Sequence, residues 1–262
     1  MSLVHPMYTK LPPDLSARLS RALARARPGA QVFFRADDAG VPSQAFSELI
    51  RLFRQLRIPL DLAVVPAWIT EKRFAALCRQ EPITDPIFCL HMHGYRHVNH
   101  EAQGKKQEFS DLRDESAIFR DLARGKERLE KILSDAFVPA FTPPWNRCGA
   151  KALESLSRLG FRAVSRSAGA TPEAGRGLAS LDVSVDLHTR KEPDAGSAWG
   201  ALFSRLSEGL AGGRPLGIMI HHQRMNREAF VFLGMLLAAL SEHGAVVLQN
   251  FRGLVPPSAP DF

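Results

Sequence analysis

Two neighbouring carboxylates stand where a short apolar run ends. Asp37 and Asp38 follow residues 32–34, which are all apolar, and a glycine comes two positions later. Further along, a second apolar run ends in four of the nine histidines: His91, His93, His97 and His100. Two imidazoles and one carboxylate can hold a divalent metal ion and leave one position open. The other carboxylate would then be free to act as a base.

Two pairs of histidines compete as metal ligands. His93 and His97 are four residues apart and would share a face if a helical turn began after the strand. His91 and His93 alternate onto one face of a strand, so this pair is the other choice. Adjacent residues of an extended chain point to opposite sides, so one of Asp37 and Asp38 is expected to ligate while the other faces the substrate.

The expected metal site would support hydrolysis. A divalent ion with an open position polarises a carbonyl group and lowers the pKa of a water molecule. Zinc is the favoured ion for two imidazoles and one carboxylate, and nickel, cobalt or iron fit the same donors. Bond cleavage also requires an acid for the leaving group, which His221 or His222 can supply at the end of a late apolar run.

Eight short apolar runs predict β-strands. They are continuous rather than alternating, as expected for parallel strands covered on both faces. Between them lie amphipathic segments, one with Phe46, Leu49, Ile50 and Phe53 on a single helical face behind Ser43 as its N-cap. This alternation predicts a single α/β domain, and about eight units favour closure into a parallel barrel. The predicted strands are residues 32–35, 60–65, 87–91, 138–141, 161–165, 181–187, 217–221 and 245–249.

The chain divides into a helical lead-in, residues 1–30, and one barrel domain, residues 31–255. Asp14 is the expected N-cap of the lead-in helix. In such barrels, chemistry collects where the strands end. We therefore expect five strand ends with polar or rigid groups to meet at one rim. These groups are Asp37 and Asp38, the histidine cluster, residues 142–147, Asp186 with His188, and His221 with His222.

The composition argues against several classes of protein. The formal charge is +7, but the basic residues are scattered and aromatic residues are few, so no nucleic-acid partner is expected. No run of 18 apolar residues and no secretory signal is seen, which favours a cytoplasmic protein with no membrane span. The three cysteines form no CxxC pair, so neither a zinc ribbon nor a disulfide framework is expected. Nothing in the composition indicates an oligomeric state.

Four motifs in order resemble a known family. The chain looks like a polysaccharide deacetylase of the NodB-homology type, a metal-dependent carbohydrate esterase. The resemblance covers about residues 30 to 250. The motifs are Asp37-Asp38, His93-x-x-x-His97, Pro143-Pro144-Trp145 and the apolar strand that ends in His221.

The resemblance implies a distorted (β/α) barrel of seven to eight parallel strands, which removes acetyl groups from N-acetylated sugars or polysaccharide. Asp37 would be the base and His221, or the adjacent His222, the acid. The backbone N–H near Trp145 would help to hold the oxyanion. The implied metal ligands are Asp38, His93 and His97. An acetylated sugar or glycan would be the partner.

The chain also departs from the family pattern. The family's Thr-Phe-Asp-Asp is replaced by Arg35-Ala36 before the acid pair, and Thr142 stands where an arginine usually opens the third motif. Arg147 or Arg35 would have to supply the missing guanidinium. The family's acid-tuning Asp-Trp motif is not evident, and Asp186 with Trp199 is its nearest counterpart.

Two other functions stay open at this point. An amidohydrolase acting on a small cyclic amide would use His91 and His93 as ligands, although in such barrels that pair follows the first strand. A non-catalytic, glycan-binding relative of the fold would explain the missing arginine at Thr142. Metal content together with acetate release would distinguish a deacetylase from such a relative.

Overall fold

The computed structural model of the protein describes residues 4–255. Within them, nine strands form one sheet, and every pairing is parallel. The sheet order is β6-β5-β4-β3-β2-β1-β8-β7, with β9 pairing the first half of β1. The strands are β1 (Ala30–Ala39), β2 (Leu60–Val64), β3 (Phe88–His93), β4 (Phe137–Thr142), β5 (Ala163–Val164), β6 (Ala179–Ser180), β7 (Val183–Asp186), β8 (Leu216–Ile220) and β9 (Val246–Gln249).

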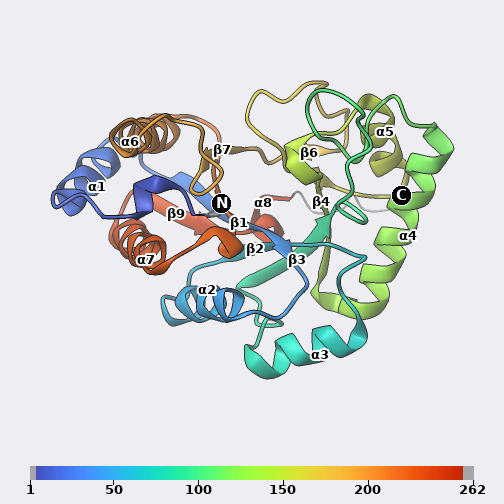
Figure 1. Ribbon diagram of the computed structural model, residues 1–262, viewed down its shortest axis with the longest axis horizontal. Helices are drawn as coiled ribbons and strands as arrows, with labels where there is room; N and C mark the ends of the chain where they lie inside the picture. The colour runs from blue at the N-terminus through green and yellow to red at the C-terminus, as the bar shows by residue number, and fades with distance from the viewer. Residues whose placement is uncertain (1–3, 256–262) are drawn as a thin grey trace.

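The sheet curls until its two ends meet, which makes the expected distorted barrel. The chain that leaves β5 pairs with β7 through an isolated bridge between Ser167 and Val183. Ala168 N–H donates to Val183 O at 2.9 Å, and Val183 N–H donates to Arg166 O at 2.7 Å. The seam therefore has few backbone hydrogen bonds, because β5 and β6 have only two residues each. The single-domain α/β prediction is confirmed (Figure 1).

Every predicted strand overlaps an observed one, β6 was not predicted, and two strands run two or more residues past their predicted ends. β1 continues through both aspartates to Ala39, which pairs with Val64 of β2. β3 continues to His93, which pairs with Thr142 of β4. These extensions were not predicted because the strands were predicted from runs of apolar residues, and the strand ends carry polar residues. Asp37, Asp38 and His93 therefore lie on the strands themselves, where hydrogen bonds between strands hold the backbone.

Helices surround the sheet (Figure 1). In α2 the predicted face is buried, and the hydroxyl of Ser43 accepts from Phe46 N–H at 3.1 Å, as an N-cap does. The α-helices are α1 (Leu15–Leu23), α2 (Gln44–Gln55), α3 (Glu71–Gln80), α4 (Glu115–Leu133), α5 (Ala150–Arg158), α6 (Ala195–Ala211), α7 (Arg227–Glu242) and α8 (Phe251–Leu254). Within residues 4–255, no helix is both long and apolar enough to cross a membrane.

The lead-in lies against the barrel wall beside α6 and α7. Its 3₁₀ turn, η1 (Pro6–Tyr8), buries Tyr8 completely, and the phenol donates to Leu187 O at 2.8 Å. Asp14 precedes α1 as predicted, but its carboxylate makes no capping bond and instead accepts from Arg18 at 2.8 Å. The helix ends at Leu23, inside the lead-in.

Candidate active site

Three side chains from two strand ends and one loop converge at the rim. Asp38 Oδ1 lies 3.3 Å from His93 Nε2 and 3.2 Å from His97 Nε2. One ligand atom of each residue lies within 4.8 Å of the other two. In the described part of the chain, this is the one group of three or more His, Cys, Asp or Glu side chains arranged to hold a metal ion.

The chemistry of these three donors fits a divalent cation. His93 Nδ1 lies 3.0 Å from the carbonyl oxygen of Thr142, which can only accept, so Nδ1 carries the proton of the neutral ring. The lone pair of Nε2 then faces Asp38. Asp38 Oδ1 is buried and accepts no hydrogen bond of good geometry. Donor atoms that converge this closely suit a cation bound between them, and a carbonyl behind a metal-binding histidine is a usual second partner.

His97 reaches the group from a loop, not from a helical turn. The prediction of a turn after the strand is wrong, since residues 94–100 contain no helix. Gly94 and His97 both have φ near +60°, which reverses the chain. A Cβ at Gly94 would clash with the Glu108 carboxylate and would lie 2.5 Å from Pro144 Cγ, so only glycine fits.

The Glu108 carboxylate shapes this loop. Although 98% buried, it accepts from Tyr95 N–H at 3.2 Å and from Arg96 N–H at 2.7 Å. Burial raises the pKa of Glu108, partly offset by these two N–H groups. The carboxylate thus satisfies backbone donors that a helix would have used differently, and it sets the path that leads to His97.

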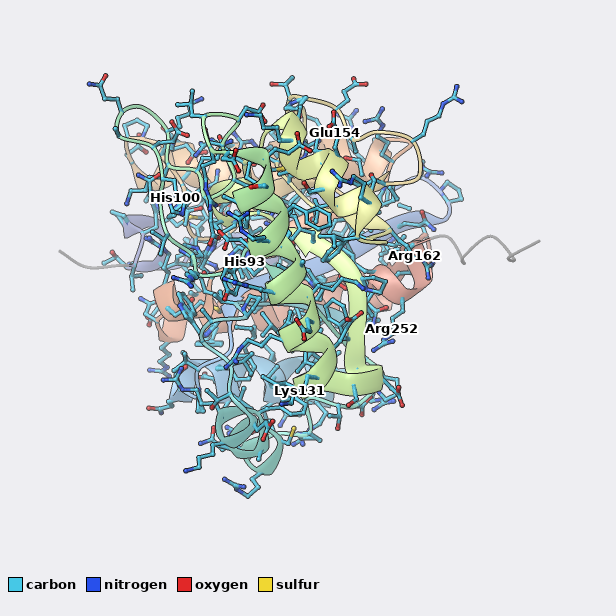
Figure 2. All side chains as sticks on the ribbon, turned by 90° about the vertical axis from the view of Figure 1, so that its right-hand side faces the viewer. His93, His100, Lys131, Glu154, Arg162 and Arg252 are labelled. Carbon is cyan, nitrogen blue, oxygen red and sulfur yellow. The ribbon has the colours of Figure 1, made fainter. Side chains whose placement is uncertain are left out.

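The alternative ligand pair is not assembled. His91 is fully buried, its Nε2 lies 2.9 Å from the Thr142 hydroxyl, and its ring packs on Phe251 with centroids 4.8 Å apart. Burial lowers the pKa of His91 to about 3, so this ring is neutral. Figure 2 shows His100 apart from His93, and His100 is exposed. The structure therefore brings His97, and not His91, to Asp38.

Arg35 is the guanidinium that holds Asp37. Its Nε and Nη2 donate to the two carboxylate oxygens of Asp37 at 2.8 and 2.9 Å, a bidentate pair. The guanidinium is fully buried and also donates to Ser165 Oγ at 2.7 Å and to Asn146 Oδ1 at 2.5 Å. Arg147 has a different place, since its Nη1 reaches Lys106 O at 3.4 Å. Of the two arginines considered from the sequence, Arg35 makes the contact.

Both aspartates are held ionised. Burial alone would raise the pKa of Asp37, but the charge of the Arg35 guanidinium outweighs it and lowers that pKa. The pKa of Asp38, which lies beside His93 and His97, is also below its usual range although burial opposes its ionisation. Asp38 has φ +63°, and this left-handed residue turns its carboxylate to the histidines, while Asp37 stays with Arg35.

The third motif forms a rigid wall. The 3₁₀ turn η3 (Pro144–Asn146) follows β4, and Trp145 and Asn146 have φ of +55° and +59°. The centroid of the indole ring lies 4.7 Å from the centroid of the His97 ring, so Trp145 packs against that imidazole. The Asn146 carboxamide binds Arg35 as described above. The motif therefore contacts both the Asp38–His93–His97 group, through His97, and the Arg35–Asp37 ion pair, through Arg35.

His221 and His222 are adjacent in the sequence but lie in different environments. His221 lines the same cleft as Asp37 and Trp145, and its backbone N–H donates to His188 Nδ1 at 3.1 Å. His222 is 98% buried, stands edge-on to Phe46, and lines a smaller neighbouring pocket. Burial lowers the pKa of His222 to about 4.

Asp186 and Trp199, the nearest counterparts of the family's Asp-Trp motif, make other contacts. Asp186 accepts from the backbone N–H groups of His188 and Thr189, both at 2.9 Å, and so stabilises its own turn. Trp199 packs edge-on to Phe232, with centroids 4.8 Å apart, and lies against Tyr8. The residue behind His221 is His188 instead, whose pKa is lowered well below the usual range by burial. This neutral ring is a hydrogen-bond acceptor.

Solved structures resemble this architecture, whereas no protein-family model and no curated protein matches the sequence. A candidate polysaccharide deacetylase from Mycobacterium smegmatis has a TM-score of 0.60 at 16% identity, over 90% of this chain and 96% of that one. A Streptococcus mutans CE4 esterase has a TM-score of 0.54 at 13% identity, over 88% and 90%. The chain has the polysaccharide deacetylase fold. A CE4 family pseudoenzyme from Bacillus anthracis is also similar, with a TM-score of 0.53 at 12% identity, over 84% of this chain and 63% of that one.

Sequence reasoning missed Glu108 and Ser165 and gave no role to Asn146, and all three residues organise the site in this deacetylase fold. Glu108 lies 14 residues after Gly94 and had no local signal, because a lone acidic residue in a polar loop is ordinary. Asn146 follows the Pro-Pro-Trp motif, and this position was the available signal. Ser165 ends a predicted strand, and its link to Arg35 depends on the barrel closing.

Proposed function

We propose that this protein is a metal-dependent hydrolase that removes acetyl groups from N-acetylated sugars or glycans. The observation that carries the proposal is the separation of the acid pair: Arg35 holds Asp37 away from the metal group that Asp38 joins. A site of this kind keeps one ionised carboxylate available as a base beside a cation. The similarity to carbohydrate esterases supports the choice of substrate class.

Asp38, His93 and His97 would hold the metal ion, which when bound would polarise the acetyl carbonyl and activate a water molecule. Zinc suits these donors, and nickel, cobalt or iron fit them as well. Asp37 accepts the proton of the attacking water, since its lowered pKa keeps it ionised at neutral pH. Arg35 keeps the carboxylate in place during this transfer.

His221 is the acid that we assign to the leaving amine, because it lines the cleft, whereas His222 is buried and lines a smaller pocket. The amine leaves as the C–N bond breaks and takes the proton from the imidazole. We assign oxyanion binding to the Trp145 backbone N–H, since the neighbouring N–H groups of Asn146 and Arg147 are bonded within the turn. Arg147 lines the cleft and is assigned to substrate binding.

The two other functions have less support. The amidohydrolase alternative required His91 as a ligand, and His91 is bonded to Thr142. The non-catalytic alternative was suggested by the missing arginine and the missing Asp-Trp motif. Arg35 compensates for the first loss by contacting Asp37 directly, and the second loss remains. The resemblance to a pseudoenzyme keeps a direct test of activity necessary.

Acetate release from a panel of N-acetylhexosamine substrates, with and without chelator, tests the proposal. Asp37→Asn should lower kcat by about 10²–10⁴-fold while the purified protein keeps its metal by elemental analysis. Asp135→Asn, an exposed aspartate on the turn before β4, is the matched control and should behave as wild type. Unaltered turnover in Asp37→Asn, or no acetate from the metal-loaded wild type, would rule the proposal out.

A further inference from the structure

The cleft above the proposed metal site is large and mostly basic. Its volume of about 930 Å³ is at the upper end of the roughly 300–1,000 Å³ typical of small-ligand sites, so it has room for more than one sugar ring. Acidic side chains also line it: Asp37, Asp38, Asp186 and Glu192. Seven basic side chains line it: Lys105, Lys106, Arg147, Arg190, Lys191, Arg205 and Arg224.

Each of the acidic side chains already has a task. Asp37 is bound by Arg35, and Asp38 belongs to the metal group. Asp186 stabilises its own turn through backbone N–H groups. Glu192 forms an ion pair with Arg190 at 2.5 Å, and that arginine side chain is only 1% exposed. Three of the four acids are thus engaged with Arg35, Arg190 or the Asp38–His93–His97 group, and in all, four acids face seven cations in the cleft.

Within residues 4–255, five of the lining cations form no ion pair with an acidic side chain: Lys105, Lys106, Arg147, Lys191 and Arg205. They come from the loop after β3, the turn after β4, the segment after β7, and α6. Unpaired like charges gathered around one concave site repel one another, and they attract anions.

Two of these cations, Lys106 and Arg147, lie close to the proposed chemistry. Lys106 Nζ is 5.9 Å from the centroid of the Trp145 ring, and that ring is 4.7 Å from His97. Arg147 donates to the backbone carbonyl of Lys106, which ties the loop to the turn. An acetylated sugar with its acetyl group at the metal site would therefore extend past Trp145 into positive charge.

We infer that the natural substrate is an N-acetylated sugar that carries phosphate. Neutral glycans would gain nothing from five uncompensated cations, and a single carboxylate would use few of them. Phosphate oxygens accept charge-assisted hydrogen bonds from both lysine and arginine. The phosphate could belong to a sugar 1-phosphate or to the diphosphate of a nucleotide sugar, which share this chemistry. The inference rests on the proposed deacetylase function for the reacting end of the substrate.

The turnover test compares N-acetylglucosamine 1-phosphate and UDP-N-acetylglucosamine with the neutral methyl glycoside of N-acetylglucosamine. At low salt, kcat/KM should be at least about tenfold higher for a phosphorylated substrate, and this advantage should shrink as salt screens the cleft. The higher value of the two phosphorylated substrates identifies the source of the phosphate. Equal kcat/KM for neutral and phosphorylated substrates at low salt would overturn the inference.

A charge variant localises the effect. Lys105→Gln/Lys106→Gln should reduce the ratio of phosphorylated to neutral kcat/KM by roughly tenfold, mainly through KM. Lys72→Gln/Lys131→Gln removes the same charge elsewhere and should leave the ratio unchanged; Figure 2 shows Lys131 at the lower end of α4, below His93. An equal drop of the ratio in both variants would point to net charge and contradict a phosphate site in the cleft.

A binding test separates this inference from the proposed function. Glucose 1-phosphate has no acetyl group and cannot be turned over, so its affinity reports the cleft alone. Calorimetry should show tighter binding of glucose 1-phosphate than of methyl glucoside, and weaker binding to Lys105→Gln/Lys106→Gln. If no substrate releases acetate, the proposed function fails while this binding result still decides the inference. Equal affinity for both sugars, or for both proteins, would refute it.

Discussion

At the residue scale, the arrangement of Asp37 depends on an arginine two positions earlier on the same strand. The side chains of Arg35 and Asp37 lie on one face of β1, since they are two residues apart. The guanidinium is fully buried, and Ser165 and Asn146 occupy its other donors. All of its nitrogens thus donate hydrogen bonds, and two of them hold the Asp37 carboxylate in one orientation. A lysine could supply the charge there but not the planar pair of hydrogen bonds.

Arg35→Lys should therefore impair Asp37, the proposed base, while the protein still binds its proposed metal ion. We expect kcat to fall by about tenfold or more, because the carboxylate loses its bidentate support. The pKa of Asp37 should rise as its main positive partner weakens, so activity should be lost at a higher pH on the acid side. A pH–rate profile and metal analysis check both points. An unshifted acid limb with wild-type kcat would exclude a positioning role for Arg35.

The two adjacent histidines should differ sharply when they are substituted. His221→Asn should lower kcat by about 10²–10⁴-fold, because it removes the proposed proton donor in the cleft. His222→Gln should keep kcat within about threefold and lower the free energy of unfolding by about 1–3 kcal/mol, since it disturbs a buried contact with Phe46. Steady-state kinetics and urea unfolding measure the two effects. The reverse pattern would transfer the acid role to His222.

At the scale of elements, the segment between β3 and α4 determines whether the metal group forms. β3 delivers His93 directly, but His97 depends on a loop that two residues with positive φ reverse. The Glu108 carboxylate, buried behind Gly94, holds that loop by two backbone N–H groups. The site therefore has one rigid and one adjustable histidine.

Glu108→Gln should weaken metal binding by roughly 10–100-fold, the range typical of changes in the groups that support metal ligands. The amide would place a donor against an N–H group that now has an acceptor, and the loop would shift His97. Competition with a metallochromic chelator measures the affinity. Glu154→Gln, on the exposed face of α5, is the control, and Figure 2 shows its position. Equal metal affinity in all three proteins would contradict this account.

At the scale of the whole molecule, the barrel encloses a carboxyl group that the site does not use. Asp61 of β2 is fully buried, and its Oδ1 accepts from Phe251 N–H at 2.8 Å, which ties α8 to the barrel. Its Oδ2 accepts no hydrogen bond of good geometry, and the Cys89 thiol lies beside the carboxyl group. Burial raises the pKa of Asp61 well above its usual range, so the folded protein holds this proton more tightly than the unfolded chain.

This proton makes stability depend on pH. The stabilising contribution of protonated Asp61 is complete below the unfolded pKa of about 4 and is lost as pH rises toward the folded pKa, by up to about 1.4 kcal/mol per pH unit. Asp61→Asn keeps the shape and removes the titration. Urea unfolding should show the variant more stable relative to wild type at pH 8 than at pH 5. A difference that is the same at both pH values, as expected for Asp135→Asn, would contradict the buried proton.

The chain by itself determined the elements and most of the chemistry. Continuous apolar runs imply strands covered on both sides, and alternation with amphipathic helices leaves a parallel barrel as the simple solution, which the structure confirms. Barrel strands end at one rim, so Asp38, His93 and His221 could be expected to meet there. These inferences need only local periodicity and the direction of the chain.

Only the tertiary structure decided which of two similar residues takes each place in the site. His97 rather than His91 joins Asp38, because Glu108 and the small space at Gly94 direct the loop. Arg35 rather than Arg147 binds Asp37, because Ser165 and Asn146 arrive from other strands to complete its hydrogen bonds. His221 rather than His222 lines the cleft, because Phe46 of α2 covers the second ring. In each case the deciding partner is distant in sequence, and its contribution exists only once the barrel has closed.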